Sequence, residues 1–311
     1  MYYYGIDIGG TTIKCGLFCD GKELVKKEEI PTRKENDGTL ILQDIADFIF
    51  KNNKICNLKK EDIACVGLGV PGAIRDDGVV NKCINLGWGV FNVTSEFENI
   101  TGIKCVAGND ANMAALGEYW VGSGSKYSSM VFITIGTGVG GGIIIDGKPL
   151  NGINGAACEI GHLPIVKEDV GVCNCGKKGC LEQVASATGI VRTGKRLLVK
   201  SDIDSSLKKY DDFTSKEIFD EAKAGDELCN EVVDYTALYL GKGLASIAAV
   251  VDPEVFVIGG GVSKAGDFLI DRIKKYYKKD VFHPSINTDI VLASLLNDAG
   301  MYGCAYLAGC R

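Results

Sequence analysis

Two apolar segments of this chain share a layout that restricts the possible folds more than any other feature. Each has an apolar strand, a glycine-containing turn and a second apolar strand, over residues 2–18 and 130–145. β-Branched and aromatic residues on both sides of a short glycine turn are typical of a β-hairpin. Because the same hairpin occurs twice, we predict a chain with two related halves.

Strands and helices alternate between and after the two hairpins. Apolar residues recur at helical spacing over residues 40–50, and residues 64–70 have the composition of a buried strand. Further predicted elements are helices over 111–120, 215–224, 226–250, 265–277 and 299–308, and a strand over 254–258. This pattern favours an α/β fold. We predict a small lobe, residues 1–108 plus 297–311, and a large lobe, residues 109–296.

Charge and hydropathy argue against several classes of partner. The 34 Lys and Arg residues are outnumbered by 40 Asp and Glu residues, so neither nucleic acid nor an anionic membrane is expected as a partner. Glycines and threonines dilute the apolar segment 130–145, and Asp252 and Glu254 interrupt segment 244–262, so neither is expected to span a membrane. The first residues lack the features of a secretory signal, and we therefore expect a cytoplasmic location.

The glycine turns have the composition of phosphate-binding loops. Small residues let backbone N–H groups approach an anion, while hydroxyl and ammonium groups add donors. In the first hairpin the candidates are Asp7, Gly9, Gly10, Thr11, Thr12 and Lys14. Taken alone, this segment is explained better as a plain tight turn, because it matches neither the Walker nor the Rossmann pattern.

The second hairpin strengthens the case for phosphate binding. Five of the seven residues 136–142 are glycines, a conformational cost that a purely structural turn would not require. Its candidate phosphate contacts are Gly136, Thr137, Gly138 and Gly140. A third run, including Gly260 and Gly261, either supports a nucleotide base or ribose or is a simple strand-to-helix turn.

One histidine and three cysteines form the most specific motif. His162 is followed by Cys173, Cys175 and Cys180 in a short glycine-containing segment. These residues are the tetrahedral Cys₃His set that zinc prefers, and a set without an open position is typical of a structural zinc site. The alternative is chance clustering, because the chain has 13 cysteines and most of the others are scattered among apolar neighbours.

Several polar residues near these motifs have the chemistry to hold a sugar. Asn109 and Asp110 stand at a predicted helix start, while Glu159 and Glu182 flank the zinc segment. Taken singly, Asp110 could cap its helix and Glu182 could stabilise a helix N-terminus. Taken together, carboxylates and an amide supply the acceptors and donors that a hydroxyl-rich ring needs.

These motifs resemble those of the ROK group of repressors, open reading frames and sugar kinases in the actin-like ATPase superfamily. The matching segments are 7–14, 69–72, 109–112, 136–142, 159–162, 173–182 and 259–262. Segments 85–88, 151–156 and 186–191 are most similar to the bacterial ROK glucokinases. The resemblance implies a two-lobed, ribonuclease H-like α/β fold with the active site in the cleft between the lobes.

The same resemblance implies ATP-dependent phosphorylation of glucose to glucose 6-phosphate. It makes Asp110 the general base and has Asp7 position Mg²⁺ through water, beside a structural zinc ion. The sugar contacts that it implies are Gly72, Asn85, Asn109, Asp110, Glu159, His162 and Glu182. Family members are often dimers or tetramers, so a homo-oligomer is expected.

Other activities stay open at this point. A ROK kinase for fructose, mannose, allose or an N-acetylhexosamine would use the same carboxylates, because specificity depends on a few pocket contacts. A non-catalytic sugar sensor would bind ATP without turnover. The family's repressors carry a helix-turn-helix domain before the first glycine turn, and because only six residues precede Asp7 here, a repressor is not expected.

Overall fold

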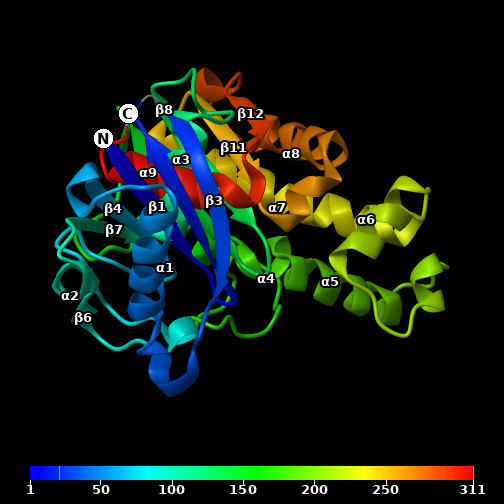
Figure 1. Cartoon of the computed structure of the whole chain (residues 1–311). Helices are drawn as coiled ribbons and strands as arrows, with labels where there is room; N and C mark the ends of the chain where they lie inside the picture. Colours follow the sequence, from blue (N-terminus) through cyan, green and yellow to red (C-terminus); the bar gives the residue numbers. More distant parts are fainter. Residues whose placement is uncertain (21, 311) are drawn as a thin grey trace. The chain divides into compact units, whose positions relative to one another are not determined.

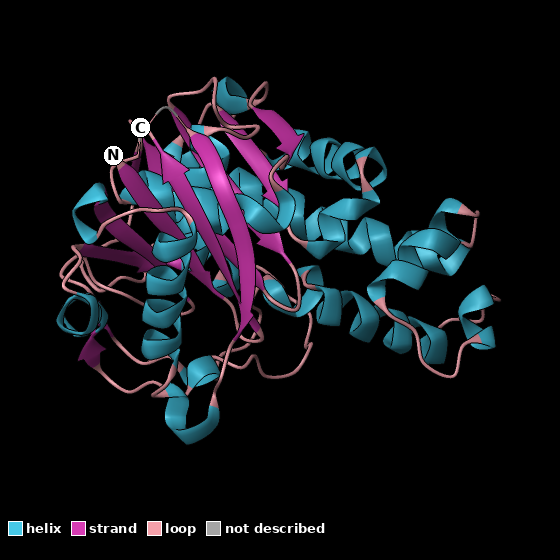
Figure 2. Cartoon of the chain, viewed as in Figure 1, coloured by secondary structure: helices cyan, strands magenta, loops and turns pink. Residues whose placement is uncertain are grey.

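The computed structural model describes residues 1–20 and 22–310. These residues form two five-stranded sheets, with the strand orders β3-β2-β1-β4-β7 and β10-β9-β8-β11-β12, and one two-stranded sheet (Figure 2). In the first sheet β4 pairs in parallel with both β1 and β7, and in the second β11 pairs in parallel with both β8 and β12. The shared strand order confirms the prediction of two related halves.

The predicted helices and strands are found within a few residues of their expected ends. The elements of the first half are β1 (Tyr2–Ile8), β2 (Thr12–Cys19), β3 (Glu23–Pro31), α1 (Ile41–Ile55), β4 (Ile63–Val70), β5 (Val79–Val80), β6 (Phe91–Asn92), α2 (Val93–Thr101), β7 (Cys105–Asn109) and α3 (Asp110–Trp120). Those that follow are β8 (Ser129–Ile135), β9 (Val139–Ile145), β10 (Lys148–Pro149), α4 (Glu182–Ala185), α5 (Ala187–Lys200), α6 (Ser215–Lys223), α7 (Glu227–Val251), β11 (Val255–Gly259), α8 (Asp267–Asp280), β12 (Asp289–Leu292) and α9 (Ala299–Leu307).

Helix α7 has 25 residues and lies alongside α8 (Figure 1). Among the described residues, no helix combines the length and the hydrophobicity that a bilayer crossing needs.

The C-terminal helix α9 packs directly on the first sheet. A Cβ atom at Gly5 would lie 2.9 Å from the backbone nitrogen of Ala305, and one at Gly67 would lie 2.7 Å from the carbonyl carbon of Cys304. Only glycine therefore allows the helix backbone to come this close to β1 and β4. The alternating side chains of β1, including Tyr4 and Ile6, are buried in one cluster with residues of α1. The last helix therefore packs on the sheet of the first half.

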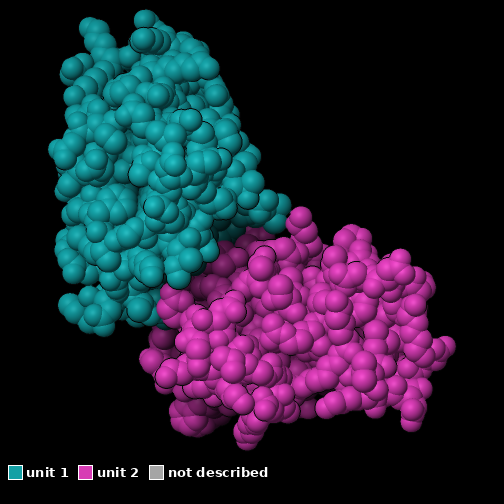
Figure 3. All heavy atoms as spheres, turned by 90° about the horizontal axis from the view of Figure 1, so that it is seen from below, with its two compact units in different colours: residues 1–128, 142–158, 295–311 teal, residues 129–141, 159–294 magenta. Residues whose placement is uncertain are grey.

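The chain divides into two compact units. Unit 1 comprises residues 1–128, 142–158 and 295–311, and unit 2 comprises residues 129–141 and 159–294 (Figure 3). These units differ from the lobes expected from the sequence, because α3 packs along α9 and therefore belongs to unit 1. The lobe boundary near Gly108 stays a prediction.

Candidate functional site

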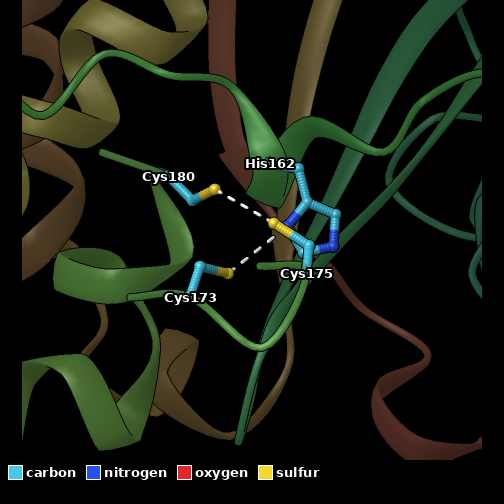
Figure 4. Close-up of side chains that lie close together, drawn as sticks. All are labelled: His162, Cys173, Cys175 and Cys180. Atoms are coloured by element: carbon cyan, nitrogen blue, oxygen red, sulfur yellow. Dashed lines mark hydrogen bonds between the residues drawn. The ribbon is translucent and has the colours of Figure 1, made fainter. Parts of the chain in front are cut away.

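The predicted zinc ligands of unit 2 lie together. The ligand atoms of His162, Cys173, Cys175 and Cys180 are all within 4.8 Å of one another (Figure 4). The sulfur atoms of Cys175 and Cys180 are 3.6 Å apart, and the Cys173 sulfur is 3.7 Å from Nδ1 of His162. Neighbouring ligand atoms around a tetrahedral zinc ion are about 3.5–3.8 Å apart, given Zn–S and Zn–N bonds of about 2.3 and 2.0 Å. The donor set therefore fits zinc in its chemistry, and the pairs at 3.6 and 3.7 Å have the spacing that the ion needs.

A tight loop brings the three cysteines together. Gly176 and Gly179 have φ angles of +82° and +80°, which L-residues with a side chain rarely adopt. The Cys173 N–H donates to the Lys177 carbonyl at 2.7 Å and closes the loop. Burial raises the pKa of Cys180 to about 12, whereas a backbone hydrogen bond at Lys177 lowers the pKa of Cys175. A cation at the centre would favour the thiolate form of these crowded groups.

The thiol loop is connected to the glycine turn of the second hairpin through Glu182. The Glu182 Oε2 atom accepts a hydrogen bond from the Val139 N–H at 3.0 Å, and its Oε1 atom is 4.0 Å from the Cys173 sulfur. Glu159 is exposed and begins the short 3₁₀ turn that carries His162, whose N–H donates to the Glu159 carbonyl at 3.0 Å. Glu182 therefore links the predicted metal cluster to the predicted phosphate turn.

Helix α5 supports the same turn from its N-terminal end. The Ala187 N–H donates to the Gly136 carbonyl at 2.8 Å, and the Thr188 hydroxyl donates to the Thr137 carbonyl at 2.9 Å. Sequence reasoning missed α5 and with it the contact of Thr188. The available signal was Ser186, whose hydroxyl caps the helix by accepting the Gly189 N–H at 3.1 Å.

A pocket of about 510 Å³ opens beside this turn within unit 2. Two glycine runs that are far apart in sequence meet on its wall, because Gly136, Thr137 and Gly261 all line it. The ring of Phe219 and the side chains of Lys216, Lys223 and Lys264 contribute to the lining. The volume lies in the ordinary range of small-ligand sites.

The N-terminus of α3 in unit 1 holds the predicted base and its neighbours. Asp110 accepts hydrogen bonds at its Oδ1 atom from the Ala111 N–H at 2.8 Å and from Asn109 Nδ2 at 3.0 Å. The same Nδ2 group donates to the Gly72 carbonyl at 3.0 Å, and Asn109 Oδ1 caps the helix. The carboxylate is thus held at the positive end of the helix.

Asn85 lies two residues after Cys83, whose thiol contacts this region. The Cys83 thiol donates to the Pro71 carbonyl at 2.5 Å, next to Gly72, and a one-turn helix over Ile84–Leu86 follows. Asn85 itself is exposed.

The first hairpin places a half-buried carboxylate close to Asp110. Burial, and then repulsion by Asp110, raise the pKa of Asp7 to about 6, while Lys14 acts in the opposite direction. The Lys14 ammonium donates to the Asn297 carbonyl. The turn itself is closed by the Gly9 N–H, which donates to the Thr12 carbonyl at 3.0 Å. Thr11 and Thr12 are exposed, and Gly10 is half-buried.

Known proteins resemble this chain over nearly its whole length. The match to the ROK family spans residues 3–310. A glucokinase of Halalkalibacterium halodurans is 43% identical over 312 aligned residues, which cover 98% of this chain and 94% of the relative. The ROK hexokinase from Thermus thermophilus has a TM-score of 0.84 at 30% identity and covers 99% of this chain and 98% of its own.

A ROK family glucokinase from Streptomyces griseus, solved in complex with glucose and AMPPNP, has a TM-score of 0.78 at 30% identity and covers 99% of each chain. Together with the repeated sheet order, these neighbours confirm the actin-like ATPase fold.

Proposed function

The chain belongs to the ROK family, and on that premise we propose that it is a glucokinase, which transfers the γ-phosphoryl group of ATP to the 6-hydroxyl of glucose. The observation that carries the proposal is the Asp110 carboxylate, held in one orientation by the Ala111 N–H and the Asn109 amide. The relatives named glucokinase support the choice of sugar.

In this proposal Asp110 accepts the proton of the 6-hydroxyl as the oxygen attacks the γ-phosphorus. The bond to the β,γ-bridging oxygen breaks and ADP leaves, so the enzyme mainly aligns the reactants and offsets charge. The sugar hydroxyls are held by Gly72, Asn85, Asn109, Glu159, His162 and Glu182. His162 can have two roles, because Nδ1 faces the thiols while the opposite ring nitrogen, Nε2, is left for a hydroxyl.

The nucleotide is assigned to the pocket that Thr137 and Gly261 line. The phosphates are contacted by the glycine turns, with Gly9, Gly10, Thr11, Thr12 and Lys14 in the first and Gly136, Thr137, Gly138 and Gly140 in the second. Gly260 and Gly261 support the base or ribose. Asp7 would hold Mg²⁺ through water, and the ion, when bound, offsets phosphate charge. The Cys₃His set would hold a structural zinc ion that keeps His162 and Glu182 in place.

A panel assay tests this proposal. Purified protein with ATP and Mg²⁺ is assayed in parallel with glucose, fructose, mannose, allose and an N-acetylhexosamine, and the zinc content is measured. We expect the highest kcat/KM with glucose and one zinc ion per chain. A higher value with another hexose would change the assigned substrate, and ATP binding without turnover of any sugar would indicate a sensor. The predicted homo-oligomer is tested by the mass in solution.

A further inference from the structure

A chain of three side chains crosses unit 1 beside the predicted base. Asn112 Nδ2 donates to Asn151 Oδ1 at 3.0 Å, and Asn151 Nδ2 donates to Asp76 Oδ1 at 2.7 Å. Asn112 stands two residues after Asp110 in the first turn of α3 and is buried, with 4% of its surface exposed. The chain therefore joins three segments, namely α3, the segment around Asn151 and the segment that follows Gly72.

The direction of these hydrogen bonds is determined by the carboxylate at one end. An ionised Asp76 only accepts, so Asn151 must present its NH₂ group to Asp76 and its carbonyl oxygen to Asn112. Asn112 must then use its NH₂ group as the donor. Neither amide can be turned over without bringing two like groups together.

This direction leaves a buried acceptor without a partner. Asn112 Oδ1 has no hydrogen-bond partner among the described residues, and a Cβ atom at Gly142 would lie 3.0 Å from it. A buried polar atom without a partner costs free energy, and its presence in a folded protein needs an explanation. The hydrogen bond that Asn112 donates to Asn151 explains it. This bond holds the Asn112 amide in the orientation that leaves its oxygen without a partner.

The segment that Asn151 begins is a compact loop. The Ala157 N–H donates to the Asn151 carbonyl at 3.1 Å, and a Cβ atom at Gly155 would lie 2.9 Å from the carbonyl carbon of Ile74. The loop thus contacts the segment after Gly72 twice, through Asp76 and through Ile74. Along the chain it leads directly to Glu159 and His162, to which the proposed function assigns sugar hydroxyls.

We propose that Asn151 and Asp76 are positioning residues for the sugar site. They hold residues 151–158 and the segment after Gly72 against the N-terminus of α3, and thereby set the affinity for glucose without taking part in phosphoryl transfer. This inference rests on the proposed glucokinase function.

The test is an exchange of charge between the two positions. Asn151→Asp keeps the size of the side chain but places a carboxylate against Asp76, so we expect the KM for glucose to rise about tenfold or more. The kcat at saturating glucose and the KM for ATP should stay within about threefold. Asp76→Asn alone should have little effect, because an amide oxygen still accepts the Asn151 N–H group. The double variant Asp76→Asn/Asn151→Asp should recover the wild-type KM, since the amide introduced at position 76 donates to the carboxylate introduced at position 151.

A matched control comes from the same loop. Asn154 is exposed, so Asn154→Ala should leave the KM for glucose unchanged. The inference is overturned if Asn151→Asp behaves like Asn154→Ala, if kcat and both KM values change in parallel, or if the double variant is no better than Asn151→Asp. If Asn151→Asp does not fold, Asp76→Ala removes the acceptor at an exposed position and should raise the KM about threefold to tenfold.

Titration calorimetry with glucose separates this inference from the proposed function. A wild-type protein that binds glucose but does not phosphorylate it would contradict the proposed function, and the same variants would still be expected to bind glucose more weakly. Unchanged glucose affinity in Asn151→Asp would contradict the positioning role alone.

Discussion

The glycine turn between β1 and β2 is supported from within its own sheet, whereas the turn between β8 and β9 is supported from outside. In unit 1 the hydroxyl of Thr32, directly after β3, donates to the Gly9 carbonyl at 2.7 Å. In unit 2 the support comes from the start of α5 and from Glu182, which lies beside the thiol cluster. The hairpin turn of unit 1 is thus held by its own sheet, and the corresponding turn of unit 2 is held by α5 and by the predicted metal loop. Substitutions at the two turns should therefore have different effects.

The largest effect is expected in unit 1, where charged side chains are assigned to the chemistry. Asp110→Asn keeps an acceptor for the Ala111 N–H but removes the proposed base, so kcat should fall about 10²- to 10⁴-fold. The glucose affinity measured by calorimetry should change little, because the new side chain has the same size. A kcat close to that of the wild type would contradict the assignment of Asp110 as the base. It would also remove the reason to expect larger effects on kcat in unit 1 than in unit 2.

Asp7 should make the free energy of unfolding depend on pH. Its pKa is raised to about 6, so protonation favours the folded chain, and this stabilisation is lost as the pH rises from about 4 through 6. Asp7→Asn should therefore increase the free energy of unfolding at pH 7 by up to about 3 kcal/mol without metal or nucleotide, and by much less at pH 4.

Urea unfolding at the two pH values measures this difference. Asp271→Asn, at an exposed site on α8, is the control for removing a surface carboxylate. Equal stabilisation of Asp7→Asn at both pH values would show that its burial does not disfavour the charge.

Loss of the thiol cluster should affect the turn of unit 2 and spare that of unit 1. Cys175→Ser should release zinc and raise the KM for glucose about 10- to 100-fold, because His162 and Glu182 lose their support. Amide hydrogen exchange should become faster at residues 136–139 and stay unchanged at residues 9–12. Cys56→Ser, in unit 1, is the control. Equal increases in amide hydrogen exchange at both turns would show that the thiol cluster does not support the unit 2 turn specifically.

The smallest effects come from deleting one hydroxyl at each turn. Thr32→Val and Thr188→Val keep the side-chain shape but lose the hydrogen bonds to the Gly9 and Thr137 carbonyls. Each should raise the KM for ATP by about fivefold, the value of one ordinary hydrogen bond. Combined with Cys175→Ser, Thr188→Val should be non-additive and Thr32→Val additive, because only Thr188 acts on the turn that Glu182 also holds. Additivity in both combinations would mean that the metal loop does not support the second turn.

Local sequence patterns were sufficient to predict the hairpins and the gathering of His162 with three cysteines. These features depend on periodicity, on glycine positions and on ligand chemistry, all of which are visible in a short window. The strand β3 was missed because its residues Lys26, Lys27, Glu28 and Glu29 resemble a solvated loop, and pairing with β2 overrides that preference. Helix α5 was missed because it contains two glycines and β-branched residues, which lower helix propensity.

The contacts between distant segments could not be predicted from the sequence. Asn112 and Asn151 are 39 residues apart, and nothing in either segment indicates that their amides meet. The same holds for the pocket where the Gly136 turn meets Gly261, because the strand order that joins them is a property of the whole second sheet.

The close packing of α9 on Gly5 and Gly67 has a consequence for synthesis on the ribosome. Residues 295–311 complete unit 1, yet they are translated after every residue of unit 2. Until they emerge, Gly5 of β1 and Gly67 of β4 lack the helix that packs on them, while unit 2 already has all of its segments. The unit whose translation starts first is therefore the last to finish folding, and a chain stalled shortly before residue 299 would expose an unfinished sheet to chaperones and to other nascent chains.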